Sequence, residues 1–310
     1  DVILISPGTY NESLVIRVAD ITLQSLDPMD ATTVESTIID GPRFPTKTID
    51  MKAHGVVLSG LNIRGSTDGI QCNYFDKLIE RCVISSGVIY KTSGIIQDNT
   101  ITAEGGIVNS HGLIQRNVIM YGKGIRSDFA LVPLTATILD NYIAHKGIGI
   151  SLCKGRIVNN TIVHNRVGLS SCDGLIRNNT IAFNTWEYGC GLAYCDGTIE
   201  GNIIYGNEAV NIPPGSPDRS VGAGLLNCNG TIRNNFIFGN YSENRGAGLA
   251  GCSGSIIIHG VISDCAYLIT MVSSLWELGE GHHAQIGNRK SGVYPTRDPG
   301  RNRSVRGIPL

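Results

Sequence analysis

The sequence predicts an all-β solenoid, a parallel β-helix in which every coil contributes three short strands. Two repeated phrases predict it. One is a seven-residue phrase built around an asparagine, and the other carries glycine and cysteine and recurs between copies of the first. Repeats of roughly twenty residues with strand-like composition are typical of solenoids, because strands this short bury a face only by stacking.

The asparagine phrase has an apolar residue three positions before the asparagine and another two positions after it. Its members are Asn99, Asn117, Asn141, Asn160, Asn179, Asn202 and Asn235, separated by 18, 24, 19, 19, 23 and 33 residues. Neighbouring strands lie about 4.8 Å apart, so identical side chains in successive coils stack at that spacing. An amide carries donors and acceptors, and we therefore expect a buried column of hydrogen-bonded asparagines.

The second phrase, G-x-G-(I/L)-x-x-C-x-G, places one cysteine in each of five coils. These are Cys153, Cys172, Cys195, Cys228 and Cys252, and Thr92 and Ser110 occupy the same slot in earlier coils. A slot that accepts serine and threonine predicts a column of small buried thiols, although neighbouring cysteines could meet the distance for a disulfide. The chain has no C-x-x-C pair, which disfavours zinc.

These phrases carry a resemblance to a known family. The opening ILISPGTYNESLVI (3–16) and the unit G-(I/L)-x-x-C-x-G-x-I-x-x-N-x-I-x-x-N resemble the right-handed parallel β-helix proteins of the pectin-lyase-like superfamily. The resemblance implies a single-stranded right-handed β-helix with three sheets and about eleven coils over residues 1–265. A leucine-rich repeat has a similar period, but it needs an L-x-x-L-x-L phrase and a helical side, and neither occurs here.

Residues 266–310 lack the repeat and form a predicted non-repetitive C-terminal cap or tail. The apolar stretch 266–278 suits a solenoid cap, and the basic, Pro- and Gly-rich stretch 291–310 suits a disordered tail, a linker or a sequence artefact. At the other end the phrase DVILISPGTY (1–10) is cut in mid-motif, which indicates a fragment or a processed chain, so a signal peptide is neither indicated nor excluded.

Composition restricts the partners of the protein. The net charge is −1 and charged residues are 16% of the chain, so there is no electrostatic case for nucleic acid. No apolar run reaches the length of a membrane-spanning helix, so we expect no membrane insertion. The family resemblance implies an extracellular or cell-surface location and polysaccharide as the partner, and the sequence does not indicate an oligomeric state.

Enzymes of this fold act along a groove on one sheet, which the resemblance places at the strand before the cysteine slot. In the five cysteine coils that strand offers interior candidates Ile150, Leu169, Leu192, Leu225 and Leu249, and the positions beside them carry no acid or base. Lyases need a cationic base and glycosidases need two carboxyls, so catalysis is not expected in this half.

The N-terminal coils are richer in titratable groups. They supply the candidate catalytic residues Asp68, Asp76, Lys91, His111 and Arg126 for a polysaccharide lyase or a glycoside hydrolase. Asp76 also shares a turn register with Asp173 and Asp196, and such a carboxylate column could bind Ca²⁺ or simply face solvent. No other cofactor or metal is indicated.

Aromatic residues at the turns are candidates for sugar binding, since flat rings stack on sugars and nearby acids bind hydroxyls. The candidates are Trp186, Tyr188, Tyr194 and Tyr241, although the same rings could instead pack over the coil edge. Two functions stay open at this point. One is an extracellular protein that binds or processes polysaccharide, and the other is a non-catalytic structural or adhesion module.

Overall fold

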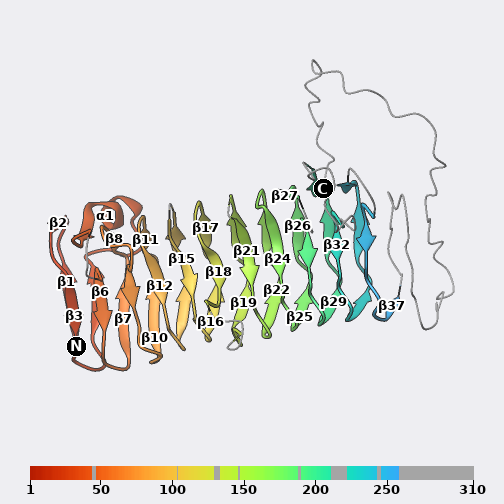
Figure 1. The fold of residues 1–310 in the computed structure, drawn as a ribbon. Helices are drawn as coiled ribbons and strands as arrows, with labels where there is room; N and C mark the ends of the chain where they lie inside the picture. The colour runs from red at the N-terminus through yellow and green to blue at the C-terminus, as the bar shows by residue number, and fades with distance from the viewer. Residues whose placement is uncertain are drawn as a thin grey trace, which may run out of the picture.

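Three long parallel sheets run the length of the described coils and enclose one apolar core (Figure 1). The structure is a computed structural model that describes residues 1–43, 47–102, 104–128, 133–145, 147–187, 190–210, 222–242 and 246–257. Within these residues the chain winds through about eleven coils, and each coil passes through the three sheets in the same order. The predicted three-sheet parallel β-helix is therefore confirmed.

The first sheet contains twelve strands among the described residues. In order they are β1 (Val2–Ile5), β4 (Thr22–Ser25), β7 (Val56–Ser59), β10 (Lys77–Glu80), β13 (Ile95–Gln97), β16 (Leu113–Gln115), β19 (Thr137–Leu139), β22 (Arg156–Val158), β25 (Leu175–Arg177), β29 (Thr198–Glu200), β33 (Thr231–Arg233) and β37 (Ile256–Ile257). Its outer face is polar towards the C-terminal end, where Glu200 forms ion pairs with Arg177 and Arg233.

The second sheet contains eleven strands in the described part of the chain. They are β2 (Gly8–Tyr10), β5 (Thr37–Asp40), β8 (Asn62–Arg64), β11 (Val83–Ile84), β14 (Thr100–Ile101), β17 (Val118–Met120), β20 (Tyr142–Ala144), β23 (Thr161–Val163), β26 (Thr180–Ala182), β30 (Ile203–Tyr205) and β34 (Phe236–Phe238).

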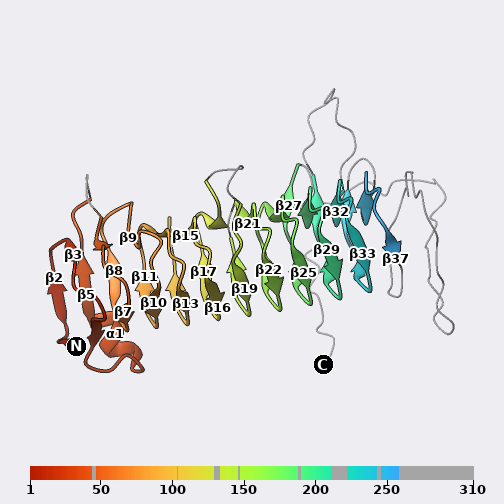
Figure 2. The same ribbon diagram turned by 90° about the horizontal axis from the view of Figure 1, so that it is seen from below.

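The third sheet also contains eleven described strands. They are β3 (Leu14–Ile16), β6 (Ile49–Met51), β9 (Ile70–Gln71), β12 (Val88–Tyr90), β15 (Gly106–Val108), β18 (Gly124–Arg126), β21 (Ile148–Ser151), β24 (Val167–Ser170), β28 (Leu192–Ala193), β32 (Leu225–Leu226) and β36 (Leu249–Ala250). In Figure 2 the coils stack along one axis, with α1 beside the first of them.

Two further elements were not indicated by the repeat. A helix, α1 (Ala31–Ser36), begins after Asp30, whose carboxylate caps it by accepting a hydrogen bond of 2.7 Å from the Thr33 amide. A small fourth sheet is formed by β27 (Thr185–Trp186), β31 (Glu208–Ala209) and β35 (Tyr241–Ser242). Among the described residues no helix has the length and apolar character needed to cross a membrane.

The asparagine column is confirmed and closes the corner between the first and second sheets. Six hydrogen bonds of 2.9–3.0 Å join each Nδ2 to the next Oδ1 from Asn99 to Asn235. Cys82 stands in the same slot one coil earlier, because its amide donates to Asn99 Oδ1 at 3.0 Å. A second column runs from Asn165 to Asn240 through three more Nδ2–Oδ1 bonds.

The cysteine column lies at the corner that follows the third sheet. Its five members are buried free thiols, as are Cys72, Cys82 and Cys190. The Thr92 amide donates to Ser110 Oγ at 3.4 Å in the coils before the column, as expected for residues in the same slot. Cys265 and the predicted C-terminal cap or tail, residues 266–310, lie outside the described residues, so the domain boundary at 265 stays a prediction.

Candidate functional site

Strand register decides which side chains of the third sheet reach the surface. Successive residues of a strand point to opposite faces. The inward column is Ile49, Ile70, Ile89, Ile107, Ile125, Ile150, Leu169, Leu192, Leu225 and Leu249, and all ten are buried. Each is followed by a residue of the outward column, so Gln71, Tyr90, Val108 and Arg126 lie side by side on neighbouring coils. Of these four side chains, Gln71 and Val108 are buried and Tyr90 and Arg126 are half-buried.

The same column has no charged residue in the C-terminal half. It continues as Ser151, Ser170, Ala193, Leu226 and Ala250. None of these side chains is an acid or a base, and the expectation that catalysis is absent there stays a prediction. The last three are buried, because Trp186 packs against this part of the sheet together with Val167. The open surface of the third sheet is therefore its N-terminal half.

A cleft of about 310 Å³, which we call the strand cleft, opens on that half. It is lined by Thr67, Asp68, Gln71, Val88, Tyr90, Val108, Lys123, Arg126 and Asp128. Arg126 Nη2 is paired with Asp128 Oδ1 at 2.8 Å. Arg126 Nε is also buried, yet it has no hydrogen-bond partner among the described atoms. A buried donor without an acceptor is costly, whereas the exposed part of the Arg126 side chain can donate to a ligand oxygen in the cleft.

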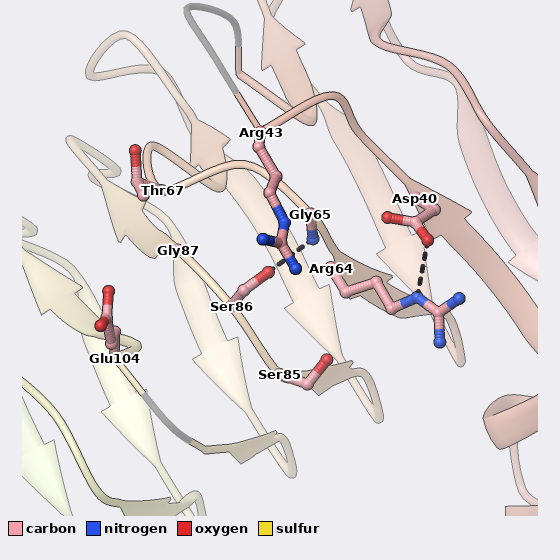
Figure 3. Close-up of a pocket in the computed structure, with 9 residues that line it drawn as sticks. All are labelled: Asp40, Arg43, Arg64, Gly65, Thr67, Ser85, Ser86, Gly87 and Glu104. Carbon is pink, nitrogen blue, oxygen red and sulfur yellow. Dashed lines mark hydrogen bonds and ion pairs between the residues drawn. The ribbon is translucent and has the colours of Figure 1, made fainter.

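A second and larger cleft, the turn cleft, lies beside the first and has a volume of about 860 Å³. Its lining consists of Asp40, Arg43, Arg64, Gly65, Thr67, Ser85, Ser86, Gly87 and Glu104 (Figure 3). Arg64 Nε donates to Asp40 Oδ2 at 2.9 Å, whereas Figure 3 shows Arg43 extending towards Ser86. Thr67 lines both clefts, so the two clefts adjoin, and we call them together the polar depression.

Two of the five candidate catalytic residues lie together, since Asp68 and Arg126 share the strand cleft. Lys91 is next to it in the turn after β12, and its Nζ is 4.9 Å from the centre of the Tyr90 ring. The Tyr90 hydroxyl accepts a hydrogen bond of 3.0 Å from Asn109 Nδ2. Lys91 therefore contacts a wall residue of the cleft without lining the cleft.

The other two candidates lie elsewhere. Asp76 is exposed and lines a separate groove of about 490 Å³ on the first sheet, beside Leu78 and Ile95. His111 Nδ1 lies 3.3 Å from Thr135 Oγ1, and its ring contacts Tyr74 with 6.1 Å between ring centres. The structure thus does not assemble all five residues around one reaction centre.

The carboxylates at the turn after the cysteine slot are engaged by the backbone. Asp173 Oδ1 accepts from the Asp196 amide at 3.2 Å, and Asp196 Oδ1 accepts from the Asn229 amide at 2.8 Å. The column continues when Asn229 Oδ1 accepts from the Ser253 amide at 3.0 Å. No group of three or more His, Cys, Asp or Glu side chains suited to a metal occurs in the described part of the chain. Ca²⁺ binding by this column stays an untested alternative to a solvent-facing turn.

The candidate sugar-binding aromatics do not share one surface patch. Trp186 is half-buried, and the Arg166 guanidinium lies over its ring at 4.3 Å. Tyr194, in the turn after β28, and Tyr241, in β35, are exposed by 52% and 54%, while Tyr188 lies outside the described residues. Trp186 therefore has the contacts of a packing residue, and sugar binding by Tyr194 and Tyr241 stays a prediction.

Several residues of the clefts were not predicted from the sequence. Gln71, Tyr90 and Lys123 line the strand cleft, and Arg43 and Arg64 line the turn cleft. The repeat contained a usable signal for two of them. Gln71 and Tyr90 directly follow the inward Ile70 and Ile89, just as Ser151 follows Ile150, so alignment of the early coils on the later ones identifies them.

Comparison with known proteins identifies no family for the chain. No protein-family model and no curated protein matches the chain. Among solved structures the chain is similar to the A-module of the mannuronan C-5 epimerase AlgE6 of Azotobacter vinelandii, with 13% identity and a TM-score of 0.41 over 83% of this chain and 90% of that one. A similarity at this level carries no argument about activity.

Proposed function

We propose that the protein binds polysaccharide in the depression formed by the strand cleft and the turn cleft. The observation that carries the proposal is the convergence of two carboxylates and two cations on one open cleft, which is lined by Asp68, Asp128, Lys123 and Arg126. Amide, hydroxyl and charged side chains that converge on a depression are suited to the hydroxyl and acidic groups of sugars. An extracellular or cell-surface location follows from this proposal.

The orientation of the depression supports a polymeric ligand. The lining of the strand cleft runs from Gln71 in β9 to Arg126 in β18, which are separated by three coil spacings or about 14 Å. The turn cleft continues it around the corner to the second sheet through Thr67. A ligand that fills both clefts is therefore larger than a single sugar ring.

Catalysis, as part of this proposal, belongs to the strand cleft. Asp68 and Asp128 supply carboxylates, and Lys123 and Arg126 supply cations. Arg126 would bind an acidic group of the sugar, and Asp68, which is exposed, would accept or donate the proton. A polysaccharide lyase and a glycoside hydrolase both fit this set of groups.

The second candidate function is a non-catalytic structural or adhesion module. It is favoured by the dispersal of Asp76 and His111 away from the strand cleft and by the absence of acids and bases in the outward column from Ser151 to Ala250. In that case the coils extend the molecule and the clefts have no chemical role.

Binding to a panel of acidic and neutral polysaccharides tests the proposal with the variant Arg126→Gln. We expect the variant to lose roughly tenfold in affinity, about 1.4 kcal/mol, because it removes a charged donor from the cleft. The matched control is Arg177→Gln, which removes an exposed, ion-paired arginine from the first sheet and should leave binding unchanged. Equal affinities of wild type and Arg126→Gln would exclude the cleft as the binding site.

Product analysis then separates the two functions. Unsaturated uronate absorbance would identify a lyase, and new reducing ends alone would identify a hydrolase. Each activity should be lost in Asp68→Asn. Binding without either product, with and without Ca²⁺, would assign the protein to the non-catalytic class.

A further inference from the structure

A line of neighbouring rings runs along the second sheet and plays no part in the clefts; four of its pairs are stacked, and the pair Phe183–Tyr205 is edge-to-face. The order is Tyr121, His145, His164, Phe183, Tyr205 and Phe238, with 5.0–5.4 Å between neighbouring ring centres. The first four occupy the turn position directly after β17, β20, β23 and β26. After β30 and β34 that position is glycine, and Phe183 lies so close to Gly206 that a Cβ there would be 2.8 Å from its ring. The distance between neighbouring rings is thus close to the spacing between successive coils, about 4.8 Å.

These rings border a flat surface without charges. We define the second-sheet face as the outward side chains of β17, β20, β23, β26, β30 and β34 together with Tyr121, His145, His164 and Phe183. The outward residues of these strands are their first and third, and none is Asp, Glu, Lys or Arg. The first sheet differs, because in the same coils its outer face carries the Arg177, Glu200 and Arg233 ion pairs.

Large apolar side chains of the face are exposed. The exposed fractions are 55% for Tyr121, 48% for Phe236, 42% for Phe183, 41% for Ile203, 38% for Phe238 and 37% for Tyr142. Aromatic side chains cover about 150–250 Å² each, so the five Tyr and Phe rings alone present on the order of 400 Å². With the imidazoles and the aliphatic residues, the face presents roughly 700–800 Å², more than the largest apolar patch of a typical monomer.

We propose that this face binds the same face of a second copy of the chain, in a symmetric dimer with the two solenoids antiparallel. The area matches the approximately 800 Å² that each partner contributes to a standard interface. Two-fold symmetry brings identical surfaces together, and a surface without charges avoids like-charge contacts. The side chains of both copies repeat at one coil spacing, so their rows interdigitate as two packed sheets do.

The charge and area arguments disfavour other occupants. An anionic polysaccharide would find no cation on the face, whereas it finds four among the residues of the two clefts. A single sugar chain would cover only a narrow strip of the area. The remaining candidate is residues 258–310 of the same chain, which would leave the protein a monomer.

Molecular mass in solution, measured for the full chain by light scattering and sedimentation over micromolar concentrations, tests the proposal. We expect wild type at twice 33.1 kDa. Thr180→Lys places a lysine near the middle of the face, on the half-buried first residue of β26, and should shift the mass to that of the monomer. Phe236→Lys at the end of the face should do the same, which guards against a folding defect in one variant.

The matched control is Thr198→Lys. Thr198 is also the half-buried first residue of its strand, β29, but it lies on the first sheet. This variant should remain a dimer, and circular dichroism should show all three variants folded. A monomeric wild type, or dimers that persist in both Thr180→Lys and Phe236→Lys, would overturn the proposal.

Discussion

Lys77 is a large, charged residue at a position where later coils of the repeat have glycine. It begins β10 and points into the core at a position where later coils have Gly94, Gly112 and Gly155. Its Nζ is buried with no hydrogen-bond partner among the described atoms, and it lies 5.0 Å from the centre of the Phe75 ring. Burial lowers the pKa of Lys77, and the nearby Cys72 and Asp76 counteract only part of this effect.

Replacing this amine with an apolar side chain of similar length should stabilise the protein. We expect Lys77→Met to raise the free energy of unfolding by about 1 kcal/mol at neutral pH, because a buried group without a partner is removed. Folding lowers the pKa of Lys77, so burial of the charged amine reduces the free energy of unfolding. This loss of stability is complete below the pKa of the folded state, and it disappears as pH rises towards 10.5, the ordinary pKa of lysine. The stability that Lys77→Met gains should therefore decrease as the pH rises.

Urea denaturation across this pH range measures the effect, with the exposed Lys154→Met as the control that should change nothing. A loss of stability in Lys77→Met would show that the amine has a structural partner.

At the scale of elements, the small fourth sheet covers part of the outer face of the third sheet. Trp186 in β27 packs on Ala193, Leu226 and Ala250, and on its other side it contacts Cys190 and Ala209. The outward residues beneath the ring are small or aliphatic because an indole covers them. This element therefore restricts the open polar surface to the coils before it.

Trp186→Ala should expose this apolar surface and lower the free energy of unfolding by about 2–3 kcal/mol, somewhat less than for a fully buried tryptophan. Tyr241→Ala, in β35 of the same sheet, should cost less than about 0.5 kcal/mol because its side chain is 54% exposed. Chemical denaturation and polysaccharide binding should be measured on both variants. Loss of binding with unchanged stability in Trp186→Ala would restore its predicted role in sugar recognition.

At the scale of the whole molecule, burial controls the chemistry of the thiols. Folding raises the pKa of Cys72, Cys82 and Cys190 from 9.0 to about 12, chiefly because burial disfavours the thiolate. The stability that protonated thiols provide is therefore complete below pH 9.0 and is lost as pH rises towards 12. The urea midpoint should fall over this interval.

Thiol labelling gives a direct check. In the native protein the eight described cysteines should stay unmodified at neutral pH, and they should react once the chain is unfolded. Rapid labelling of several thiols in the native state would contradict the buried column.

The fold was predictable from the sequence because the repeat specifies it many times over. Asn160 or Cys172 alone indicates little, but each recurs at a spacing that only stacked coils explain. The site was less predictable because it is formed where the repeat is irregular. Arg43 and Glu104 reach the turn cleft from turns outside the repeated phrases, and Asp76 follows two residues, Tyr74 and Phe75, that displace its turn. Such local departures have no periodic signal.

Because the asparagine column repeats coil by coil, the length of the molecule can change through deletion or duplication of whole coils. Asn141, Asn160 and Asn179 are separated by 19 residues each, and each side-chain amide bonds only within its own coil and to the coils directly before and after it. Loss of residues 160–178 would bring Asn179 to the place of Asn160, with the same bond to Asn141. Duplication of the same segment would add a rung with all contacts repeated. A gene of this kind can change the reach of its product by whole coils while the polar depression near its beginning stays intact.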